Sequence, residues 1–374
     1  MHIIALMLYS ALFFWKFWKN PYLNNTSEMA TTFYPHWVWM GRQLKAGKLP
    51  LTDNIYFKYP ACIPFLSTFY LPHLLTSITG SFRVLQWTVL SHYFLTSLLT
   101  YKLFLQWCQP EVALFGAITL AYAGYCIKIQ QPCIAYTLAW IPGAFLPGWL
   151  GTVSMAMALY AGYYPILIYV LPFILINNWI HGGFYGSLLG IALALPQIVP
   201  FLWYYTKSVR WKSVSSYAHG FGRVTFRSLC QFFLPLRQRS HTNDVMFMEM
   251  QMYIGLLPFL FIWLSHSRFW FVLAAGLAIA TGLLRPIQRI PARALYLVTL
   301  SLVILSTDGL SKICLSHAQL WMIVGLQAAC LLFNRDIYPS FPFTQWWGKG
   351  HKLDYTGYLN GVSLHEYRGA FSIK

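Results

Sequence analysis

The amino-acid sequence predicts an all-α polytopic membrane protein with about ten transmembrane helices. Hydrophobic residues make up 57% of the 374 residues and charged residues only 9%. A water-soluble surface needs roughly a quarter to a third of charged residues. The apolar residues are also gathered in runs close to the ~20 residues that a membrane-crossing helix needs. This composition argues against two or three soluble domains.

The elements follow from these apolar runs. The first run, Ile3 to Trp18, lacks a basic segment before it and a cleavage site after it, which predicts a membrane anchor and not a removed signal peptide. Prolines in 63–79 predict an interfacial or re-entrant segment, and those in 152–180 predict one broken helix or two short ones. In order, the candidate spans are 3–18, 63–79, 84–107, 111–127, 133–150, 152–170, 184–206, 251–266, 268–284, 292–308 and 316–333.

Long polar stretches interrupt the transmembrane domain, which we assign to residues 1–333. They form a first loop at 19–62 and a second, basic loop at 207–250, and a polar tail follows at 334–374. We expect surface chemistry in these two loops, because they contain four of the nine acidic residues. These four are Glu28, Asp53, Asp244 and Glu249.

The charge balance and the cysteines exclude several function classes. The formal net charge is +17, but the cations do not cluster on a polar domain and no nucleic-acid-reading motif occurs. Anionic lipid head groups or phosphates are therefore the expected partners, and nucleic acid is not. None of the seven cysteines forms a C-x-x-C pair, which favours small buried hydrophobes over a metal site or disulfide framework.

The first loop contains a predicted amphipathic helix and an ordered set of motif residues. His36, Trp37, Met40 and Leu44 alternate with cations in a pattern typical of a short helix lying on lipid head groups. The motif residues of the loop and of the segment after it are Glu28, Tyr34, Pro35, Gly47, Leu49, Pro50, Leu51, Tyr56, Phe57, Pro60, Tyr70, Pro72 and Leu74.

This order resembles the first extracytoplasmic loop of the bacterial YfhO-type membrane proteins, which belong to the GT-C superfamily of lipid-linked-sugar glycosyltransferases. Weaker similarities follow in the same order, and the matches cover about residues 20–315. They are Leu138–Pro142, Ala161–Pro165, Ala194–Pro200, Ser208–Arg210, Glu249 with Tyr253–Pro258, Arg289–Arg293 and Gly309–Leu310.

The resemblance implies a GT-C-like bundle with two large extracytoplasmic loops in the plasma (inner) membrane. It implies transfer of a sugar from a polyprenyl-phosphate donor to a cell-envelope acceptor, with Mg²⁺ or Mn²⁺ as a candidate cofactor. The family usually has Asp where this chain has Glu28, and its members are longer. A non-catalytic GT-C-like scaffold or partner subunit of a membrane complex is therefore the alternative. A small-molecule or lipid transporter is the third.

Each candidate site residue also has a structural interpretation. Glu28, the expected acceptor-orienting carboxylate, is otherwise a solvated loop acid, and Asp53 is otherwise a turn or cap residue. Basic residues suit the donor phosphate or anchor the chain to head groups, and aromatic residues suit a sugar ring or an interfacial belt. The candidate substrate-binding residues are Tyr34, His36, Arg42, Lys58, Arg210, Lys212 and Glu249.

The orientation of the two loops is predicted differently by two arguments. The resemblance places 19–62 and 207–250 outside the cytoplasm, whereas the positive-inside rule places such basic loops inside. We follow the resemblance, because an ordered set of motifs is the more specific signal. Two further acids, Glu111 and Asp308, lie at the ends of apolar runs, which is typical of boundary residues and less so of a proton relay.

Overall fold

The computed structural model is all-α within its described residues, apart from one pair of two-residue strands. The strands β1 (Thr52–Asp53) and β2 (Tyr59–Pro60) pair antiparallel. This confirms the predicted all-α class. The structure describes residues 1–15, 34–48, 52–53, 59–60, 69–127, 132–207, 253–281, 283 and 291–334.

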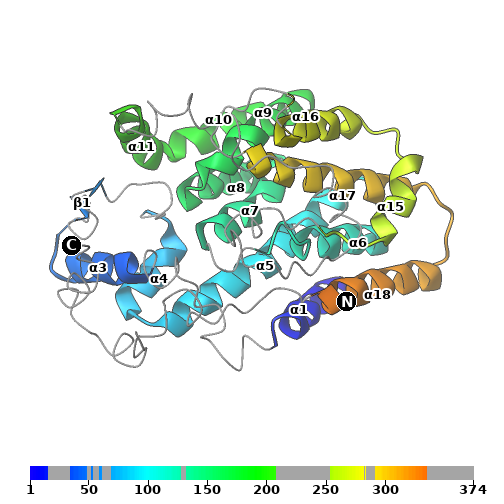
Figure 1. Ribbon diagram of the computed structural model, residues 1–374, viewed down its shortest axis with the longest axis horizontal. Helices are drawn as coiled ribbons and strands as arrows, with labels where there is room; N and C mark the ends of the chain where they lie inside the picture. The colour runs from blue at the N-terminus through cyan, green and yellow to red at the C-terminus, as the bar shows by residue number, and fades with distance from the viewer. Residues whose placement is uncertain are drawn as a thin grey trace.

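Four helices from the first half of the chain form the centre of the molecule (Figure 1). They are α5 (Phe82–Phe104), α6 (Pro110–Ala121), α7 (Pro132–Ala144) and α8 (Gly148–Ala161). The helix α5 packs on both α6 and α7, and α8 covers α7. Two of these helices, α6 and α7, begin with proline, which is favoured in the first turn because it lacks the N–H that a helix start leaves unpaired.

A second group of elements comes from the last third of the chain and packs on α6. It consists of α15 (Leu257–Phe261), the 3₁₀ turn η5 (Ile262–Leu264), α16 (Phe269–Thr281), the 3₁₀ turn η6 (Pro291–Ala294) and α17 (Leu295–Ser311). The helix α17 lies against α6, α15, η5 and α16. It therefore joins the two halves of the chain.

The core of the molecule is centred on α6 and α17. Every residue from Glu111 to Ala121 is buried, and α17 is buried along almost its whole length. A helix that is apolar all round is stable only when other helices surround it. Gly116 lets α6 lie close to α5 and α17. A Cβ at this position would lie 2.5 Å from the Thr307 hydroxyl of α17 and 2.4 Å from the Phe104 ring of α5.

The proline-containing stretch 152–180 forms two helices. The helix α8 ends at Gly162, whose φ of +79° is left-handed, and α9 (Tyr164–Ile180) begins after it. A single span over 152–170 is therefore wrong, and the alternative of two short helices is confirmed. The physical reason is that a left-handed residue ends a right-handed helix, and glycine adopts this conformation without a steric penalty.

The predicted span 184–206 also contains a break. It consists of α10 (Phe184–Leu193) and α11 (Leu195–Lys207), and α10 packs on α8. Ala194 separates the two helices. The Tyr160 hydroxyl donates a 2.8 Å hydrogen bond to the Leu193 carbonyl, which compensates one backbone group that the break leaves without a helical partner.

The terminal helices of the described chain lie side by side along one edge of the bundle (Figure 1). They are α1 (His2–Phe13) and α18 (His317–Asn334). The Tyr9 hydroxyl on α1 donates a 3.0 Å hydrogen bond to the Ala328 carbonyl on α18. Both helices also contact α6, so they cover the same side of the core.

Two short helices, α3 (Tyr34–Lys45) and α4 (Leu71–Thr79), lie together at the opposite end from α15 (Figure 1). The helix α4 lies within the predicted interfacial segment 63–79, of which residues 63–68 lie outside the described residues. The chain turns at Gly80, with a φ of +62°, and enters α5.

Several of the described helices, such as α1 and α6, are shorter than the predicted spans 3–18 and 111–127. Among the described helices, none has on its own both the length and the apolar composition for a bilayer crossing. The bent pair Phe184–Leu193 and Leu195–Leu202, with 66° between its two parts, meets both requirements when taken together. Most of the two predicted loops lies outside the described residues, as does the predicted tail 334–374 apart from Asn334, which ends α18.

Candidate functional site

The structure describes part of the predicted sugar-transfer site. Tyr34, His36 and Arg42 lie on α3, and Asp53 lies on β1, opposite Tyr59 of β2. The α3 and β1 segments lie at the same end of the molecule (Figure 1). The other candidate residues lie outside the described residues: Glu28, Lys58, Arg210, Lys212 and Glu249.

The helix α3 forms where the amphipathic pattern predicted it, but its apolar side packs on protein. Trp37 and Met40 are 0% and 1% exposed, and they face inward beside α4. Gly41 marks the crossing point, since a Cβ there would lie 1.7 Å from the Ser77 carbonyl oxygen of α4. The predicted contact of Trp37 and Met40 with head groups is therefore wrong, because protein covers them.

The basic residues of this segment are on the solvent-accessible side. Arg42, Lys45 and Lys48 are all exposed, whereas Trp37 and Met40 are buried. We call the three cations the α3 basic surface. Such a surface suits an anionic phosphate group, and the guanidinium of Arg42 has the geometry for a bidentate contact.

A buried cluster of ring side chains, the aromatic–histidine cluster, joins α3 and α4 to the central helices. Its members come from α3, the start of α4, α5 and α7, and all but Trp140 are buried. Segments far apart in the sequence thus meet at one place. The members are Trp37, Tyr70, His73, His92, Tyr136 and Trp140.

Hydrogen bonds run through one half of the cluster in a single direction. Trp140 Nε1 lies 2.6 Å from the Tyr70 hydroxyl, which lies 2.5 Å from His92 Nε2. His92 Nδ1 lies 2.5 Å from the Thr88 carbonyl oxygen. An indole N–H only donates and a carbonyl only accepts. Trp140 therefore donates to Tyr70, and His92 donates through Nδ1 to Thr88, which leaves Nε2 of a neutral His92 to accept the Tyr70 proton.

The second half of the cluster is held by ring packing. The His73 ring centroid lies 4.0 Å from that of Trp37 and 4.6 Å from that of Tyr136. Tyr136 in turn lies 4.3 Å from His92. These contacts tie α3 to α4, and α4 to α5 and α7. They hold the helix that presents the α3 basic surface against the central bundle.

This arrangement favours a positioning role over proton transfer to solvent. Tyr70 is 0% and His92 4% exposed, and each polar atom in the chain from Trp140 to Thr88 has a partner. Neither His92 nor Tyr70 is among the site residues predicted from the sequence. A histidine inside an apolar run is a signal for a special role, but its tyrosine and tryptophan partners come from other parts of the chain.

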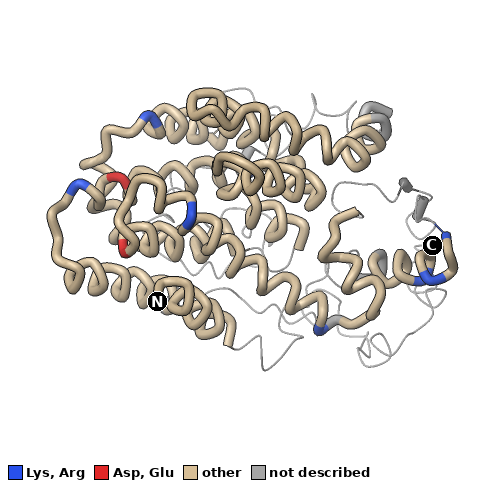
Figure 2. The backbone as a smooth tube through the Cα atoms, turned by 180° about the vertical axis from the view of Figure 1, so that it is seen from behind, with Lys and Arg blue, Asp and Glu red and all other residues tan. Residues whose placement is uncertain are grey.

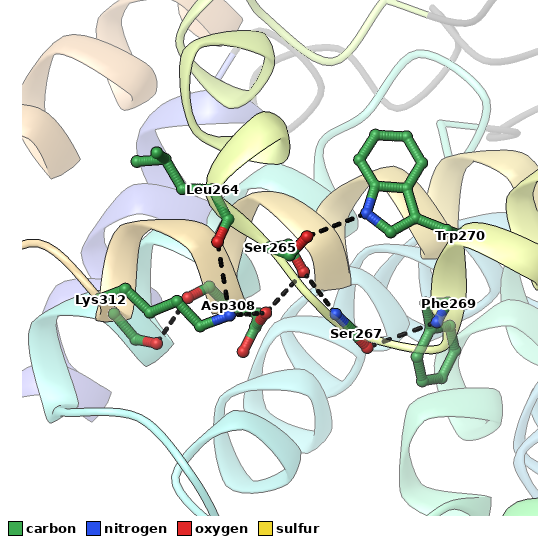
Figure 3. Close-up of polar contacts among 8 residues, drawn as sticks. Leu264, Ser265, Ser267, Phe269, Trp270, Asp308 and Lys312 are labelled. Atoms are coloured by element: carbon green, nitrogen blue, oxygen red, sulfur yellow. Dashed lines mark hydrogen bonds and ion pairs between the residues drawn. The ribbon is translucent and has the colours of Figure 1, made fainter.

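A separate polar network lies at the C-terminal end of α17 (Figure 3). The Ser265 hydroxyl donates to Asp308 Oδ2 at 2.5 Å, and Lys312 Nζ lies 3.0 Å from the same oxygen. Lys312 also donates to the Leu264 carbonyl at 3.4 Å, and the Trp270 indole donates to the Ser265 carbonyl at 3.0 Å. Asp308 is thus a paired residue at a helix end, as its position in the sequence indicated.

The cysteines follow the predicted pattern in part. Cys126 and Cys133 are buried, but Cys314 is exposed after the end of α17, so the prediction of a buried residue is wrong there. Burial raises the pKa of the Cys108 thiol to about 12, and a hydrogen bond with Ser311 partly opposes this shift. A thiol with so high a pKa is a poor nucleophile near neutral pH.

Within the part of the chain that the structure describes, no group of three or more His, Cys, Asp or Glu side chains is arranged to hold a metal ion. The divalent cation implied by the resemblance would require the loop carboxylates, of which Glu28 and Glu249 lie outside the described residues. Comparison of the chain with protein-family models, with curated proteins and with solved structures gives no match.

Proposed function

We propose that the chain is a multi-pass protein of the plasma membrane, of the GT-C type, which transfers a sugar from a polyprenyl-phosphate donor to a cell-envelope acceptor. The proposal rests first on the ordered motifs of the first loop, from Glu28 to Leu74. The observation that supports it best is the α3 basic surface, which α4 and the aromatic–histidine cluster hold at one end of the helical bundle.

The surface composition supports a membrane location. Large apolar side chains are exposed on several helices, including Trp179 at 70%, Tyr185 at 83% and Phe271 at 80%. The lysines, arginines and acids visible in Figure 2 gather towards the two ends of the molecule. An aqueous surface rarely exposes so much apolar area, whereas lipid favours apolar contact between two charged ends.

The α3 basic surface suits the phosphate of the donor. In the proposed reaction the bond between the sugar and the phosphate breaks, and the polyprenyl phosphate leaves with the electron pair. Cations near the leaving oxygen stabilise the developing negative charge. Arg42, Lys45 and Lys48 have this charge and are open to a ligand, because the apolar side of α3 faces α4.

Glu28 is the proposed acceptor-orienting carboxylate. It would accept the proton of the acceptor hydroxyl while the hydroxyl oxygen forms the new bond to the sugar. Its side chain is one methylene longer than the Asp usual in the family. A shift of about 1 Å in a reacting group can change a rate by about a hundredfold.

The proposal is tested with Glu28→Gln, which keeps the size of the side chain and removes its charge. In a strain that depends on this protein, we expect the glycolipid or envelope-glycan product to fall at least about tenfold, an estimate from typical acid–base contributions. Glu366→Gln, an acid of the polar tail, is the matched control and should leave the product unchanged.

Expression and membrane content of both variants are measured in parallel. An unchanged glycan profile in Glu28→Gln would overturn the enzymatic proposal. If the profile depends on the presence of the chain but not on Glu28, the scaffold or partner-subunit alternative is favoured.

A further inference from the structure

The short helix α4 exposes its apolar side. Leu71, Leu75 and Ile78 are 66%, 59% and 53% exposed. Their spacing, four residues and then three, places them on one side of the helix. We call these three side chains the α4 apolar strip. Contact with water is unfavourable for such a surface, and a helix at an aqueous surface normally turns its apolar side inward.

The opposite side of α4 carries polar residues and is buried. His73 and Thr76 are 0% exposed, and Ser77 is 3% exposed. The side-chain hydroxyl groups of Thr76 and Ser77 make no hydrogen bond with any residue that the structure describes. Burial of unpaired polar groups costs free energy. This orientation of α4 is therefore unfavourable in water, whereas an apolar medium around the α4 apolar strip favours it.

Basic side chains lie next to the α4 apolar strip. Gly41 of α3 approaches the backbone of Ser77 on α4, and the residues that follow these two are Arg42 and Ile78. The α3 basic surface and the strip therefore lie beside the same crossing of two helices (Figure 1).

The start of α5 continues this arrangement. Arg83 and Trp87 lie one turn apart and are both exposed. Tryptophan is enriched at the level of lipid head groups, and arginine on an apolar surface extends its charge towards the same level. The sequence contains no acidic residue at 29–52 or at 54–110. The charged side chains of α3 and of the start of α5 are thus all basic, which is complementary to anionic lipid phosphates.

A second protein surface fits the α4 apolar strip less well than lipid does. Stable protein interfaces use about 20–30 residues on each side, and the strip belongs to a helix of nine residues. A lipid monolayer requires no such area, because a short amphipathic helix binds it by inserting apolar side chains just below the head groups.

We propose that α4 lies in the surface of an anionic phospholipid bilayer. The α4 apolar strip contacts the acyl chains, and Arg42, Lys45 and Lys48 of the α3 basic surface contact the phosphates. The prolines of 63–79 predicted an interfacial segment, but they did not indicate which side chains face lipid.

This inference rests on the membrane location in the proposed function and does not depend on sugar transfer. It also bears on the donor. The phosphate of a lipid-linked donor lies at the level of the other lipid phosphates, so the donor reaches the α3 basic surface from within the bilayer and not from water.

The test replaces Leu75 with the photoreactive residue p-benzoylphenylalanine in the full chain. The chain is reconstituted in vesicles of equal parts phosphatidylcholine and phosphatidylglycerol and irradiated, and the adducts are identified by mass. Because Leu75 is exposed, the larger side chain needs no repacking of the core. We expect lipid adducts at this position, with phosphatidylglycerol captured about fivefold more often, the ratio expected for one cation near the head groups.

Two further variants, each carrying the same photoreactive residue, separate apolar contact from charge. Replacement of Arg42, Lys45 and Lys48 by Gln should leave the lipid adducts and abolish the preference for phosphatidylglycerol. Arg268→Gln is the control, because Arg268 is also exposed but precedes α16, near the end of the molecule that contains α15 (Figure 1). It should retain both the adducts and the preference.

The inference is overturned if no lipid is captured, if the adduct joins two copies of the chain, or if the two lipids are captured equally with the α3 basic surface intact. None of these outcomes affects the proposed sugar transfer, which depends on the product formed by Glu28→Gln. Loss of that product would in turn leave the lipid adducts unchanged.

Discussion

Tyr70 connects three helices because its hydroxyl group both accepts and donates a hydrogen bond. It lies at the start of α4, accepts from Trp140 of α7 and donates to His92 of α5. The bond to His92 is buried and the bond from Trp140 is partly buried, so water cannot replace the bond to His92 if the hydroxyl is removed. An unpaired buried donor or acceptor costs about 1–3 kcal/mol.

We therefore expect Tyr70→Phe to lower the free energy of unfolding by about 2–4 kcal/mol, since it leaves the Trp140 N–H and His92 Nε2 without partners. The measurement is thermal or denaturant unfolding of the purified chain. Protease cleavage at the α3 basic surface should also become faster, because α4 supports α3.

The matched control is Tyr136→Phe, in the same cluster. Tyr136 is also fully buried, but its hydroxyl makes no hydrogen bond with a residue that the structure describes. Loss of this hydroxyl should change stability little or raise it slightly. Equal destabilisation by the two substitutions would show that ring packing, and not hydrogen bonding, holds the cluster together.

Single residues of this cluster were visible in the sequence, but their contacts were not. Tyr70 and Trp140 both lie in segments that resemble the GT-C family, and nothing in their spacing indicates that they touch. Glu111 shows the same limit. Its place at the start of an apolar run predicts a boundary residue, and only the packing of distant helices brings His2 of α1 and His317 of α18 to it.

At the scale of elements, α3 shows why an amphipathic pattern alone does not identify the surface that it covers. The apolar side of a helix packs equally well on lipid or on another helix. Gly41 decides between them here, because its lack of a Cβ lets the backbone of α3 approach the Ser77 carbonyl of α4.

We expect Gly41→Ala to force α3 away from α4 and to destabilise the pair by about 1–3 kcal/mol, the usual range for overpacking. A Cβ at this position would lie 1.7 Å from backbone, which cannot move like a side chain. The measurement is limited trypsin digestion, in which cleavage after Arg42 and Lys45 should become faster.

Gly325→Ala on α18 is the control for a glycine-to-alanine change in a helix, since a Cβ there meets nothing within 4 Å. It should leave the cleavage rate at α3 unchanged. Unchanged cleavage in Gly41→Ala would mean that α3 is not held by this contact.

The breaks between helices were predicted where the sequence contains a residue with restricted or unusual backbone geometry. Gly162 ends α8 in a left-handed conformation, within the stretch 152–180 whose prolines predicted a break. The break at Ala194 has no such signal at the residue itself. It is accommodated by tertiary structure, because Tyr160 of α8 pairs with the exposed carbonyl of Leu193.

At the scale of the whole molecule, the distribution of charge is the main feature. The chain has 26 basic and nine acidic residues, and the charged residues visible in Figure 2 lie mostly near its two ends. The described helices also expose many large apolar side chains. This arrangement suits a bilayer whose head groups contact both ends.

The proposed membrane location predicts the behaviour of the chain on extraction. It should remain in the membrane fraction after washing with alkaline carbonate or about 1 M salt, because apolar contact with lipid does not depend on charge pairing. Only detergent should release it. Release by carbonate or salt would contradict insertion in the bilayer and indicate attachment through the α3 basic surface alone.

The sequence by itself determined the all-α class, the approximate positions of most helices and the amphipathic character of α3. These follow from composition and from periodicity, which act locally along the chain. Only the tertiary structure decided that α4 covers Trp37, that Tyr70 joins Trp140 to His92, and that Glu111 meets two histidines. The physical reason is that burial and hydrogen bonding depend on which distant segments pack together. The local pattern of apolar and polar residues does not specify which segments these are.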